Sequence, residues 1–272
     1  MISDAPQPGA LALLESFCKR LAATDWRQPN GPLRLNADLK LIDLANAGFF
    51  INTRIFLNAL AEAEGAPATA TGRLNRVFVQ QMFERLKLDS DFRDSIRTVC
   101  KVVNEQDLWP LHLVRIISEI AGLVARRKKH FILTKTGRAM LPDNQAGALF
   151  QRLFIAYFQR FDLHYDFHCR NVPGIQQTLG IILWRLEVVA RHWKAVRGLA
   201  SEILTPGVHA QLRQAMLSSY DTEEWILGGY VLEPLSDFGL IERQKHSERR
   251  IIAEKDFIQI TPLWRKFIRF VL

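Results

Sequence analysis

Four consecutive basic residues, Arg126-Arg127-Lys128-Lys129, form the most concentrated charge in this sequence. Lys135 and Arg138 follow them, and no acidic residue lies between Gly122 and Met140. Guanidinium and ammonium groups clustered in this way attract phosphates, so the run predicts a partner that carries phosphate groups. The alternative is a solvated hairpin turn, because lysine and arginine also protect exposed strands from aggregation. The charge pattern supports the two interpretations about equally.

A second chemical candidate is the pair His164 and His168, which would share one face of a helix if a helix extends through both. With an aspartate or Cys169 nearby, such a pair could hold a zinc ion. No second cluster of ligands occurs, and the other histidines are scattered. The interleaved tyrosine and phenylalanine suit a helix end packed on the core. We therefore predict no metal and no cofactor.

Signatures of common enzyme classes are missing from the sequence, which has no Gly-rich phosphate loop, Gly-x-Ser-x-Gly turn or paired-carboxylate pattern. Phe154, Tyr157, Phe158 and Phe161 lie at helical spacing and could stack on single-stranded bases. One face of an amphipathic helix has to be buried, however, so we expect these rings in the core. The sequence predicts a binding protein and not an enzyme.

Composition limits the class of protein. The chain has 272 residues, of which 48% are hydrophobic, enough for one large folded domain or two. Its three cysteines are odd in number and far apart, as expected of reduced thiols in a cytoplasm. No apolar run is long enough for a membrane helix, and the first residues lack the layout of a signal peptide. We expect a cytoplasmic protein with a net charge of +8 and no membrane contact.

The basic run lies in one of the few segments without helical spacing. Leu123–Arg138 reads as two short strands joined by a basic turn, between a helix at Trp109–Ile120 and one that starts at Thr136 or Gly137. Helix, hairpin, helix is the outline of a winged-helix unit. Thr69–Arg73 repeats the Thr-x-Thr-Gly-Arg pattern found at the end of this hairpin, and we expect both copies to mark a strand that leads into a helix.

The outline recurs near the carboxyl end, where a helix at Glu223–Leu235 precedes a strand at Gly239, a polar turn, and a returning strand at Phe257. We predict a mainly α fold, multi-helical with two winged-helix-like units whose wings are small β-hairpins. Residues 1–142 would end in the first unit, 143–204 would form a connecting layer of long helices, and 205–272 would form the second unit. The remaining predicted helices are Leu11–Leu21, Ala37–Ala45, Thr53–Glu64, Asn75–Leu86, Asn144–Phe161, Pro173–Leu199, Val208–Leu217 and Leu263–Val271.

Several of these segments resemble one known family. Ala70–Val79, Val103–Asp107, Gly122–Leu141 and Phe154–Trp184 are similar to the helical, winged-helix-like part of a poorly characterised bacterial family known from plasmid- and transposon-associated open reading frames. The match covers about half of the chain. It implies a prokaryotic source, a helical core with small hairpins, and no established activity, and it carries over no catalytic residue.

These patterns lead to one expected function. In helix-turn-helix and related proteins a recognition helix enters the major groove, and in a winged helix the wing reaches phosphate. We expect His112, Arg115 and Glu119 to be the exposed, weakly base-reading positions of the helix before the hairpin. Lysines and arginines that could contact phosphates are more numerous, so we predict DNA binding mainly to the backbone, with a regulatory role as the expected task. The predicted nucleic-acid-binding residues are Arg73, Arg76, His112, Arg115, Arg126, Arg127, Lys128, Lys129, His130, Lys135 and Arg138.

The second unit predicts a different use. Its helix Asp221–Glu233 carries four acidic residues and no basic one, so DNA would repel it, and its wing Arg243–Arg250 mixes both signs. We expect packing within the protein or a homodimer through this unit. The rival function is accordingly a winged-helix scaffold for protein–protein interaction without a nucleic acid partner. A large exposed apolar patch around Trp225–Leu232 would favour it.

Overall fold

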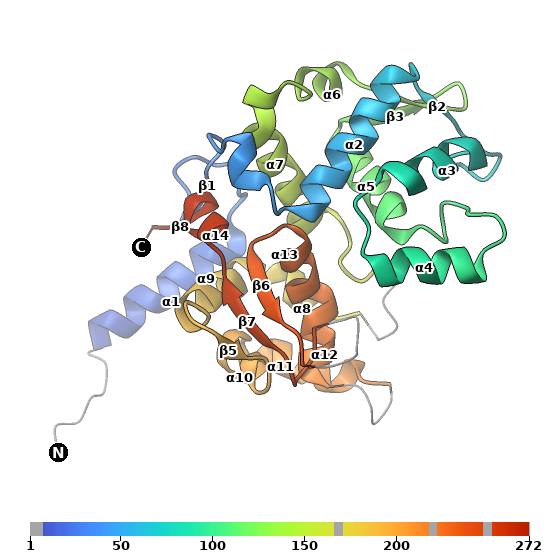
Figure 1. Ribbon diagram of the computed structural model, residues 1–272. Coiled ribbons are helices and arrows are strands. Elements are labelled where there is room, and N and C mark those ends of the chain that lie inside the picture. The colour runs from blue at the N-terminus through green and yellow to red at the C-terminus, as the bar shows by residue number, and fades with distance from the viewer. Residues whose placement is uncertain (1–7, 166–170, 218–221, 247–251, 272) are drawn as a thin grey trace. The chain divides into compact units, whose positions relative to one another are not determined.

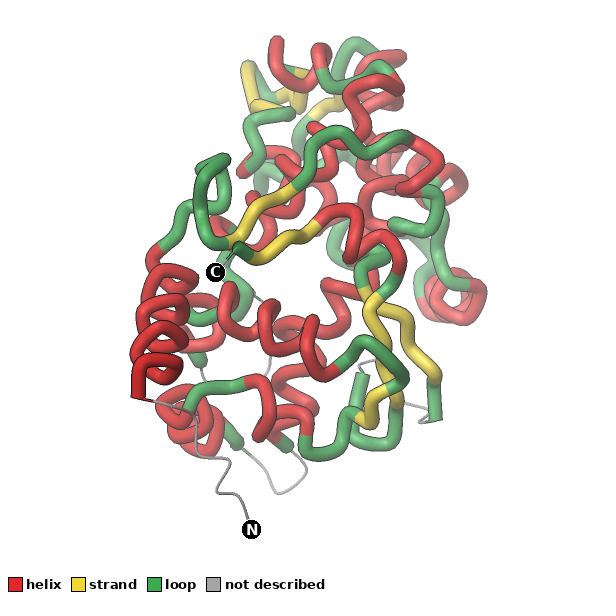
Figure 2. The backbone as a smooth tube through the Cα atoms, turned by 90° about the vertical axis from the view of Figure 1, so that its left-hand side faces the viewer, coloured by secondary structure: helices red, strands yellow, loops and turns green. Residues whose placement is uncertain are grey.

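The computed structural model describes residues 8–165, 171–217, 222–246 and 252–271, and these form two compact units (Figure 1). We call Ala37–Phe161 with Asp237–Gly239 the central unit, and Met1–Asn36 with Asp162–Ser236 and Leu240–Leu272 the terminal unit. Helices dominate both units and the sheets are small (Figure 2), so the predicted mainly α class is confirmed. Of the helices in the described ranges, none combines the length and the apolar composition that crossing a bilayer requires.

The central unit alternates helices with one small sheet. Its strands are antiparallel and lie in the order β2-β4-β3, so the edge strand β2 comes from a part of the chain far from the hairpin. Its elements are η1 (Leu41–Leu44), α2 (Gly48–Glu62), β2 (Ala66–Pro67), α3 (Arg76–Arg85), α4 (Ser90–Val99), α5 (Trp109–Ile120), β3 (Val124–Arg127), β4 (His130–Leu133), α6 (Lys135–Ala139), η2 (Asp143–Gln145), α7 (Ala146–Ile155) and the π-helical turn η3 (Ala156–Arg160).

The core of the central unit forms around α5 and α7. Helix α5 packs against α2, and its residues Leu111, Val114 and Ile117 are buried. The predicted aromatic stripe of α7 and η3 is also in the core, where Phe154 and Tyr157 meet the ring of Phe238 edge to face at 5.7 and 5.6 Å. Edge-to-face rings add to the burial of their large apolar area. The prediction that these aromatics pack in the core is confirmed.

The terminal unit contains a second three-stranded sheet in the order β5-β7-β6, and a separate pair, β1-β8, that joins the two ends of the chain. Its elements are α1 (Pro8–Ala23), β1 (Leu33–Leu35), α8 (Pro173–Gln177), α9 (Leu179–Val189), β5 (Lys194–Ala195), α10 (Leu199–Ile203), α11 (Pro206–Ala215), α12 (Glu223–Leu227), the π-helical turn η4 (Gly228–Leu232), α13 (Glu233–Asp237), β6 (Ile241–Gln244), β7 (Phe257–Ile260), α14 (Pro262–Phe267) and β8 (Ile268–Phe270).

The two sheets follow the same plan, each considered within its own unit. In the central unit, helix α2 leads to strand β2, then α3 to α5, then the hairpin β3–β4; in the terminal unit, α9 leads to β5, then α10 to α13, then the hairpin β6–β7. The edge strand pairs with the second hairpin strand at the same register, Pro67 with His130 and Ala195 with Phe257. Each hairpin has four facing residue pairs. The turns that connect the two strands of each hairpin differ: two residues lie between β3 and β4, and twelve lie between β6 and β7.

The hairpins also begin in the same way. A glycine with positive φ ends the preceding helix, Gly122 at 71° and Gly239 at 69°, a conformation that glycine adopts without a steric penalty. A threonine follows each hairpin and caps the next helix: the Thr134 hydroxyl accepts from the Gly137 amide, and the Thr261 hydroxyl accepts from the Trp264 amide. The helix after the first hairpin consequently starts at Lys135, just before the predicted Thr136 or Gly137.

The helix predicted at Leu263–Val271 is wrong in its last part, because α14 ends at Phe267 and Ile268–Phe270 form strand β8, which pairs with β1. Two further predicted helices are also wrong. The segment Pro173–Leu199 is divided into α8 and α9, and its last part is the strand β5, because Lys194 and Ala195 pair with β7. The segment Ala37–Ala45 contains only the 3₁₀ turn η1, since residues 37–39 have no regular secondary structure and pass against α7, where a Cβ on Gly147 would overlap the Ala37 carbonyl. Tertiary pairing and packing override helical spacing in both cases.

Candidate nucleic-acid interface

The basic run forms the tip of the hairpin β3–β4. Arg127 faces His130 across the ladder, which leaves Lys128 and Lys129 as a two-residue turn. Their φ angles are 46° and 61°, as in a type I′ turn. Asparagine and glycine favour this turn, whereas a lysine held in the left-handed region costs about 1 kcal/mol. The chain thus keeps two lysines where other residues would make the turn more stable.

Burial of one side of the hairpin fixes its orientation. Phe131 and Leu133 of β4 are buried, and Leu123 before β3 is fully buried. The alternate residue His130 is exposed, as are all four residues of the basic run. Alternation along β4 therefore holds Phe131 and Leu133 in the core, while the end of the hairpin with the basic run extends into solvent.

A turn from a distant part of the chain lies beside the tip. The Ala68 amide donates to the Lys129 carbonyl at 2.7 Å, and residues 69–73 then fold into a turn closed by the Thr69 amide on the Arg73 carbonyl at 2.7 Å. Gly72, with φ of 77°, faces the guanidinium of Arg126, and a Cβ there would lie 3.4 Å from Cζ and overlap Nη1. Arg73 is thus brought to the side of the hairpin.

Helix α3 starts directly after this turn. The Asn75 side chain caps it by accepting from the Phe78 amide at 3.0 Å, while the Asn75 amide donates to the Pro67 carbonyl at 3.0 Å. Arg76 is exposed at the first position of the helix and donates from Nε to Asn104 at 3.0 Å. We call Arg73, Arg76, Arg126, Arg127, Lys128 and Lys129 together the basic surface.

The other two predicted basic residues lie at the opposite end of the hairpin. Lys135 and Arg138 belong to α6, which follows the last residue of β4, and both are exposed. Four residues of strand, roughly 13 Å, separate them from the tip. The structure therefore brings Arg73 and Arg76 to the tip and leaves Lys135 and Arg138 at the base.

No described carboxylate neutralises these cations. Within 4 Å, none of the six residues of the basic surface forms an ion pair with a carboxylate in the described ranges, and neither does Lys135 or Arg138. Elsewhere in the central unit arginines are paired: Arg85 lies 2.7 Å from Glu62, and Arg54 lies 2.6 Å from Asp143. An unpaired cluster of cations produces a stronger positive potential than the same number of paired ones.

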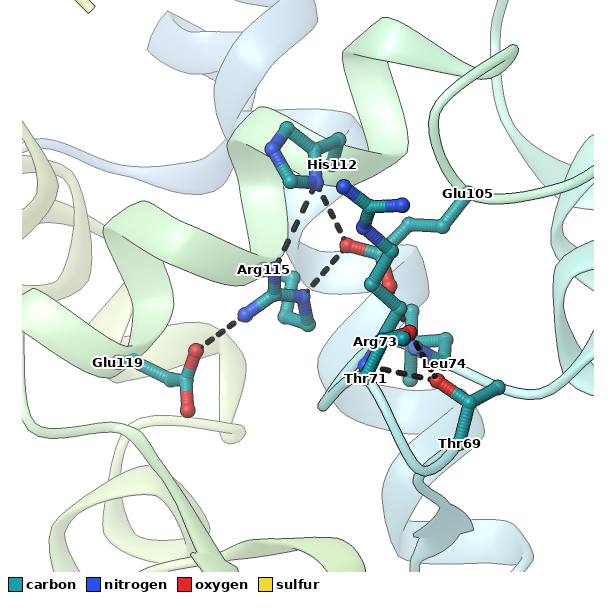
Figure 3. A network of polar contacts seen from close by, with 8 residues as sticks. All are labelled: Thr69, Thr71, Arg73, Leu74, Glu105, His112, Arg115 and Glu119. Atoms are coloured by element: carbon teal, nitrogen blue, oxygen red, sulfur yellow. Dashed lines mark hydrogen bonds and ion pairs between the residues drawn. The ribbon is translucent and has the colours of Figure 1, made fainter.

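The predicted exposed positions of α5 are wrong. His112 and Arg115 are buried, and no residue of Trp109–Ile120 is classed as exposed. Both contact the fully buried carboxylate of Glu105, His112 from Nδ1 at 2.7 Å and Arg115 from Nε at 2.6 Å (Figure 3). Arg115 also pairs with Glu119 and lies over the Phe131 ring at 5.1 Å. These side chains hold the core together, so α5 has no free face for a groove.

Glu105 links α5 to the turn beneath the basic surface. Its second oxygen accepts from the Leu74 amide, next to Arg73 (Figure 3). Burial by itself would raise the pKa of Glu105, but the His112 hydrogen bond, the Arg115 charge and the Leu74 amide together hold it below its ordinary value. The carboxylate therefore stays ionised and fixes the turn. A histidine and an arginine on the buried stripe of α5 were the sequence signal for such a partner.

The second hairpin uses its arginine internally. Arg243 occupies the same register position as Arg126, but it donates to the buried Asp256 at 2.8 Å. Burial would raise the pKa of Asp256, whereas the amides of Ala253 and His246 and the charge of Arg243 lower it overall. Asp256 thus fixes the returning end of the long turn; the rest of the predicted wing, residues 247–250, lies outside the described residues.

The segment Trp225–Leu232, where an exposed apolar patch would have favoured the scaffold function, is mostly buried. Ile226, Leu227, Tyr230, Val231 and Leu232 are all buried. This stretch packs inside the terminal unit, which agrees with packing within the protein as the use of its acidic helix. The homodimer through this unit stays a prediction.

The histidine pair is only partly described. Helical structure ends at Arg160, so His164 lies in a turn, and its Nδ1 is 2.8 Å from the Tyr230 hydroxyl. His168 and Cys169 lie outside the described residues. Among the residues that the structure does describe, no group of three or more His, Cys, Asp or Glu side chains is arranged to hold a metal ion.

The part of the chain that carries the basic surface is similar to known proteins. Residues 45–147 match the model of the Y4jL N-terminal domain. An uncharacterized protein y4jL from Sinorhizobium fredii (strain NBRC 101917 / NGR234) is 31% identical over 115 residues, which are 42% of this chain. The chain spans about half the length of that relative, 51%. No solved structure matches the chain. Residues 45–147, with the basic surface and Glu105, are thus similar to the N-terminal domain of a poorly characterised bacterial family.

Proposed function

We propose that the protein binds DNA through its phosphate backbone, with the basic surface as the contact. The observation that carries this proposal is the unpaired positive charge on the type I′ tip, to which a separate turn adds Arg73 and Arg76. Each cation placed on a phosphate releases a counterion, so the affinity should fall steeply as salt rises. A regulatory task would follow from such binding.

In this proposal both units have a winged-helix-like architecture, and the central unit is the one that binds DNA. The order helix, strand, helices and hairpin, with the first strand added beside the second hairpin strand, supports this assignment. The wing makes the phosphate contacts, because α5, the usual recognition helix by position, is buried. The second hairpin takes no part, since Asp256 and Glu233 lie against its Arg243.

The rival scaffold function has less support. The apolar patch that would have favoured it is buried in the terminal unit. A protein partner with an acidic surface would still suit the basic surface. The experiment must therefore measure nucleic acid binding directly.

The test uses fluorescence anisotropy with a labelled random-sequence duplex over a salt series. The double variant Lys128→Asn, Lys129→Gly removes two cations and supplies the residues that a type I′ turn favours. We expect weaker binding and a log affinity–log salt slope smaller by about 2, at roughly 0.9 per phosphate contact. Because the turn itself becomes more favourable, unfolding does not account for such a loss.

The matched control removes two exposed lysines from the other hairpin, in the variant Lys245→Asn, Lys255→Asn. It has the same net charge as the test variant and should keep most of the affinity and the wild-type slope. Absence of binding at low salt, or equal losses in the two variants, would contradict the proposal.

A further inference from the structure

The exposed face of α3 lies beside the basic surface. Helix α3 begins one residue after Asn75, whose amide bonds to Pro67, and Pro67 pairs with His130 at the edge of the tip. The helix therefore starts on the side of β2 that faces away from the hairpin, about two strand spacings (roughly 10 Å) from β4, and its first residue, Arg76, belongs to the basic surface. Its amino end adds the positive end of the helix dipole to the same surface.

The composition of this face suits contact with bases. Phe78, Val79, Met82 and Phe83 hold the helix to the core. On the opposite side Val77 is 67% exposed. One turn further, Gln80 and Gln81 are exposed.

The glutamine side chains of this face have few hydrogen bonds within the protein to give up when a ligand binds. Within the described ranges, the side chain of Gln81 forms no hydrogen bond, and the side chain of Gln80 has only a long one of 3.4 Å to Glu84. Glu84 lies at the far end of the face, where Arg93 and Arg97 are 3.8 and 3.6 Å away. The one acid of the face is thus compensated and distant from the tip.

We propose that Val77, Gln80 and Gln81 of α3 enter the major groove of duplex DNA and read base edges while the basic surface holds the flanking phosphates. This inference rests on the proposed phosphate binding. Glutamine can pair with both the N6 amine and N7 of adenine, and a methyl-bearing side chain can contact the methyl group of thymine. Ten residues of helix are about 15 Å long, and the groove is about 12 Å wide, so the first turns of α3 fit across it.

The choice of duplex DNA follows from groove shape. The major groove of an A-form RNA duplex is too deep and narrow for side chains to read. An RNA duplex should therefore bind by its phosphates alone. Helix α3 replaces the buried α5 as the reading element, with adenine- and thymine-containing sites as the expected targets.

The experiment begins with selection of wild-type protein against a pool of duplexes with about 20 random base pairs. The enriched duplex and a shuffled version of it are then compared by anisotropy. We expect a preference of about tenfold or more for the enriched duplex, since each bidentate contact discriminates at that level. In the variant Gln80→Ala, Gln81→Ala the preference should fall below about threefold, while binding to the shuffled duplex stays within about twofold.

Two controls separate this inference from the proposal beneath it. Gln177→Ala removes an exposed glutamine of the terminal unit and should leave the preference unchanged. The Lys128→Asn, Lys129→Gly variant should bind the enriched and the shuffled duplex more weakly by the same factor, so that the ratio of the two affinities is unchanged. Circular dichroism of each variant checks that the fold is intact.

The outcomes differ for the two ideas. If the wild-type protein binds no duplex, the phosphate-binding proposal itself fails. If it binds but enriches no sequence, or if the glutamine variant keeps the full preference, α3 is not the reading element and phosphate binding stands alone. An RNA duplex of the enriched sequence that binds as tightly as the DNA would also overturn the α3 assignment.

Discussion

The guanidinium of Arg126 lies directly against Gly72, so that any side chain at position 72 would overlap it. Strand β3 and the 69–73 turn are far apart in the sequence, and this contact brings their arginines to one place. The relationship depends on the absence of a Cβ atom and on a φ of 77°. It leads to the first prediction.

Gly72→Ala should weaken nucleic acid binding several-fold as Arg126 is displaced, and should lower the free energy of unfolding by about 1 kcal/mol because of the positive φ. Gly122→Ala is the matched control, since Gly122 has a φ of 71° but open space around it. The Gly122→Ala variant should show the same loss in the free energy of unfolding, measured with urea, and an unchanged affinity for nucleic acid, measured by anisotropy. Equal binding by both variants would show that the place of Arg126 is unimportant.

The strained tip gives a prediction of opposite sign for stability. Lys128→Asn, Lys129→Gly should raise the free energy of unfolding by about 1 kcal/mol, because asparagine and glycine adopt positive φ more readily than lysine. Thermal or urea unfolding measures this, with Lys245→Asn, Lys255→Asn as the control for lost charge. A destabilised tip variant would argue that the two lysines are favoured by contacts within the fold.

Glu105→Gln should destabilise the central unit by about 3 kcal/mol at neutral pH, because the buried Arg115 loses its buried ionised partner and keeps only the more exposed Glu119. Glu119→Gln, at a partly exposed position on the same arginine, should cost much less. Urea unfolding of the purified variants measures both costs.

The same carboxylate predicts a dependence on pH. Since its pKa in the folded protein is lower than the usual value of 4.5, the stabilisation is complete above that value and is lost as the pH falls through the lowered pKa. The difference between wild type and Glu105→Gln should therefore be full at pH 7 and shrink in acid. A difference that stays constant from pH 7 to about pH 3 would contradict an ionised Glu105.

Asp256→Asn tests the independence of the second hairpin. The buried Asp256 compensates Arg243 and accepts the Ala253 and His246 amides, so its loss should destabilise the protein by about 3 kcal/mol. Nucleic acid binding at temperatures below unfolding should be unchanged, as measured by anisotropy. A large drop in affinity would place the second hairpin in the binding surface.

Local patterns accounted for the elements that form the site. The helix Trp109–Ile120 and both hairpins were predicted because helical spacing stops at a glycine and alternation follows. The 69–73 segment was expected to resemble the end of the hairpin, but it is a turn, and Asn75 caps the helix after it instead.

Long-range contacts explain what the sequence did not reveal. Strand β2 has two residues, and β5 lay within a predicted helix, so only pairing with a distant hairpin defines them. The exposure of α5 was misjudged because His112 and Arg115 are polar, and their burial depends on Glu105, which lies outside the helix. A side chain that satisfies a buried partner across a fold leaves no periodic signal.

The short tip of the first hairpin has a consequence for recognition. Lys128 and Lys129 have their backbone fixed by the ladder pair Arg127–His130, so these residues have little backbone freedom left to lose when a ligand arrives. Binding by such a preorganised group costs less entropy than ordering a flexible basic tail. The points on the backbone from which the two lysine side chains extend are also set in advance. The flexible side chains alone then have to adjust to the phosphates that the tip meets.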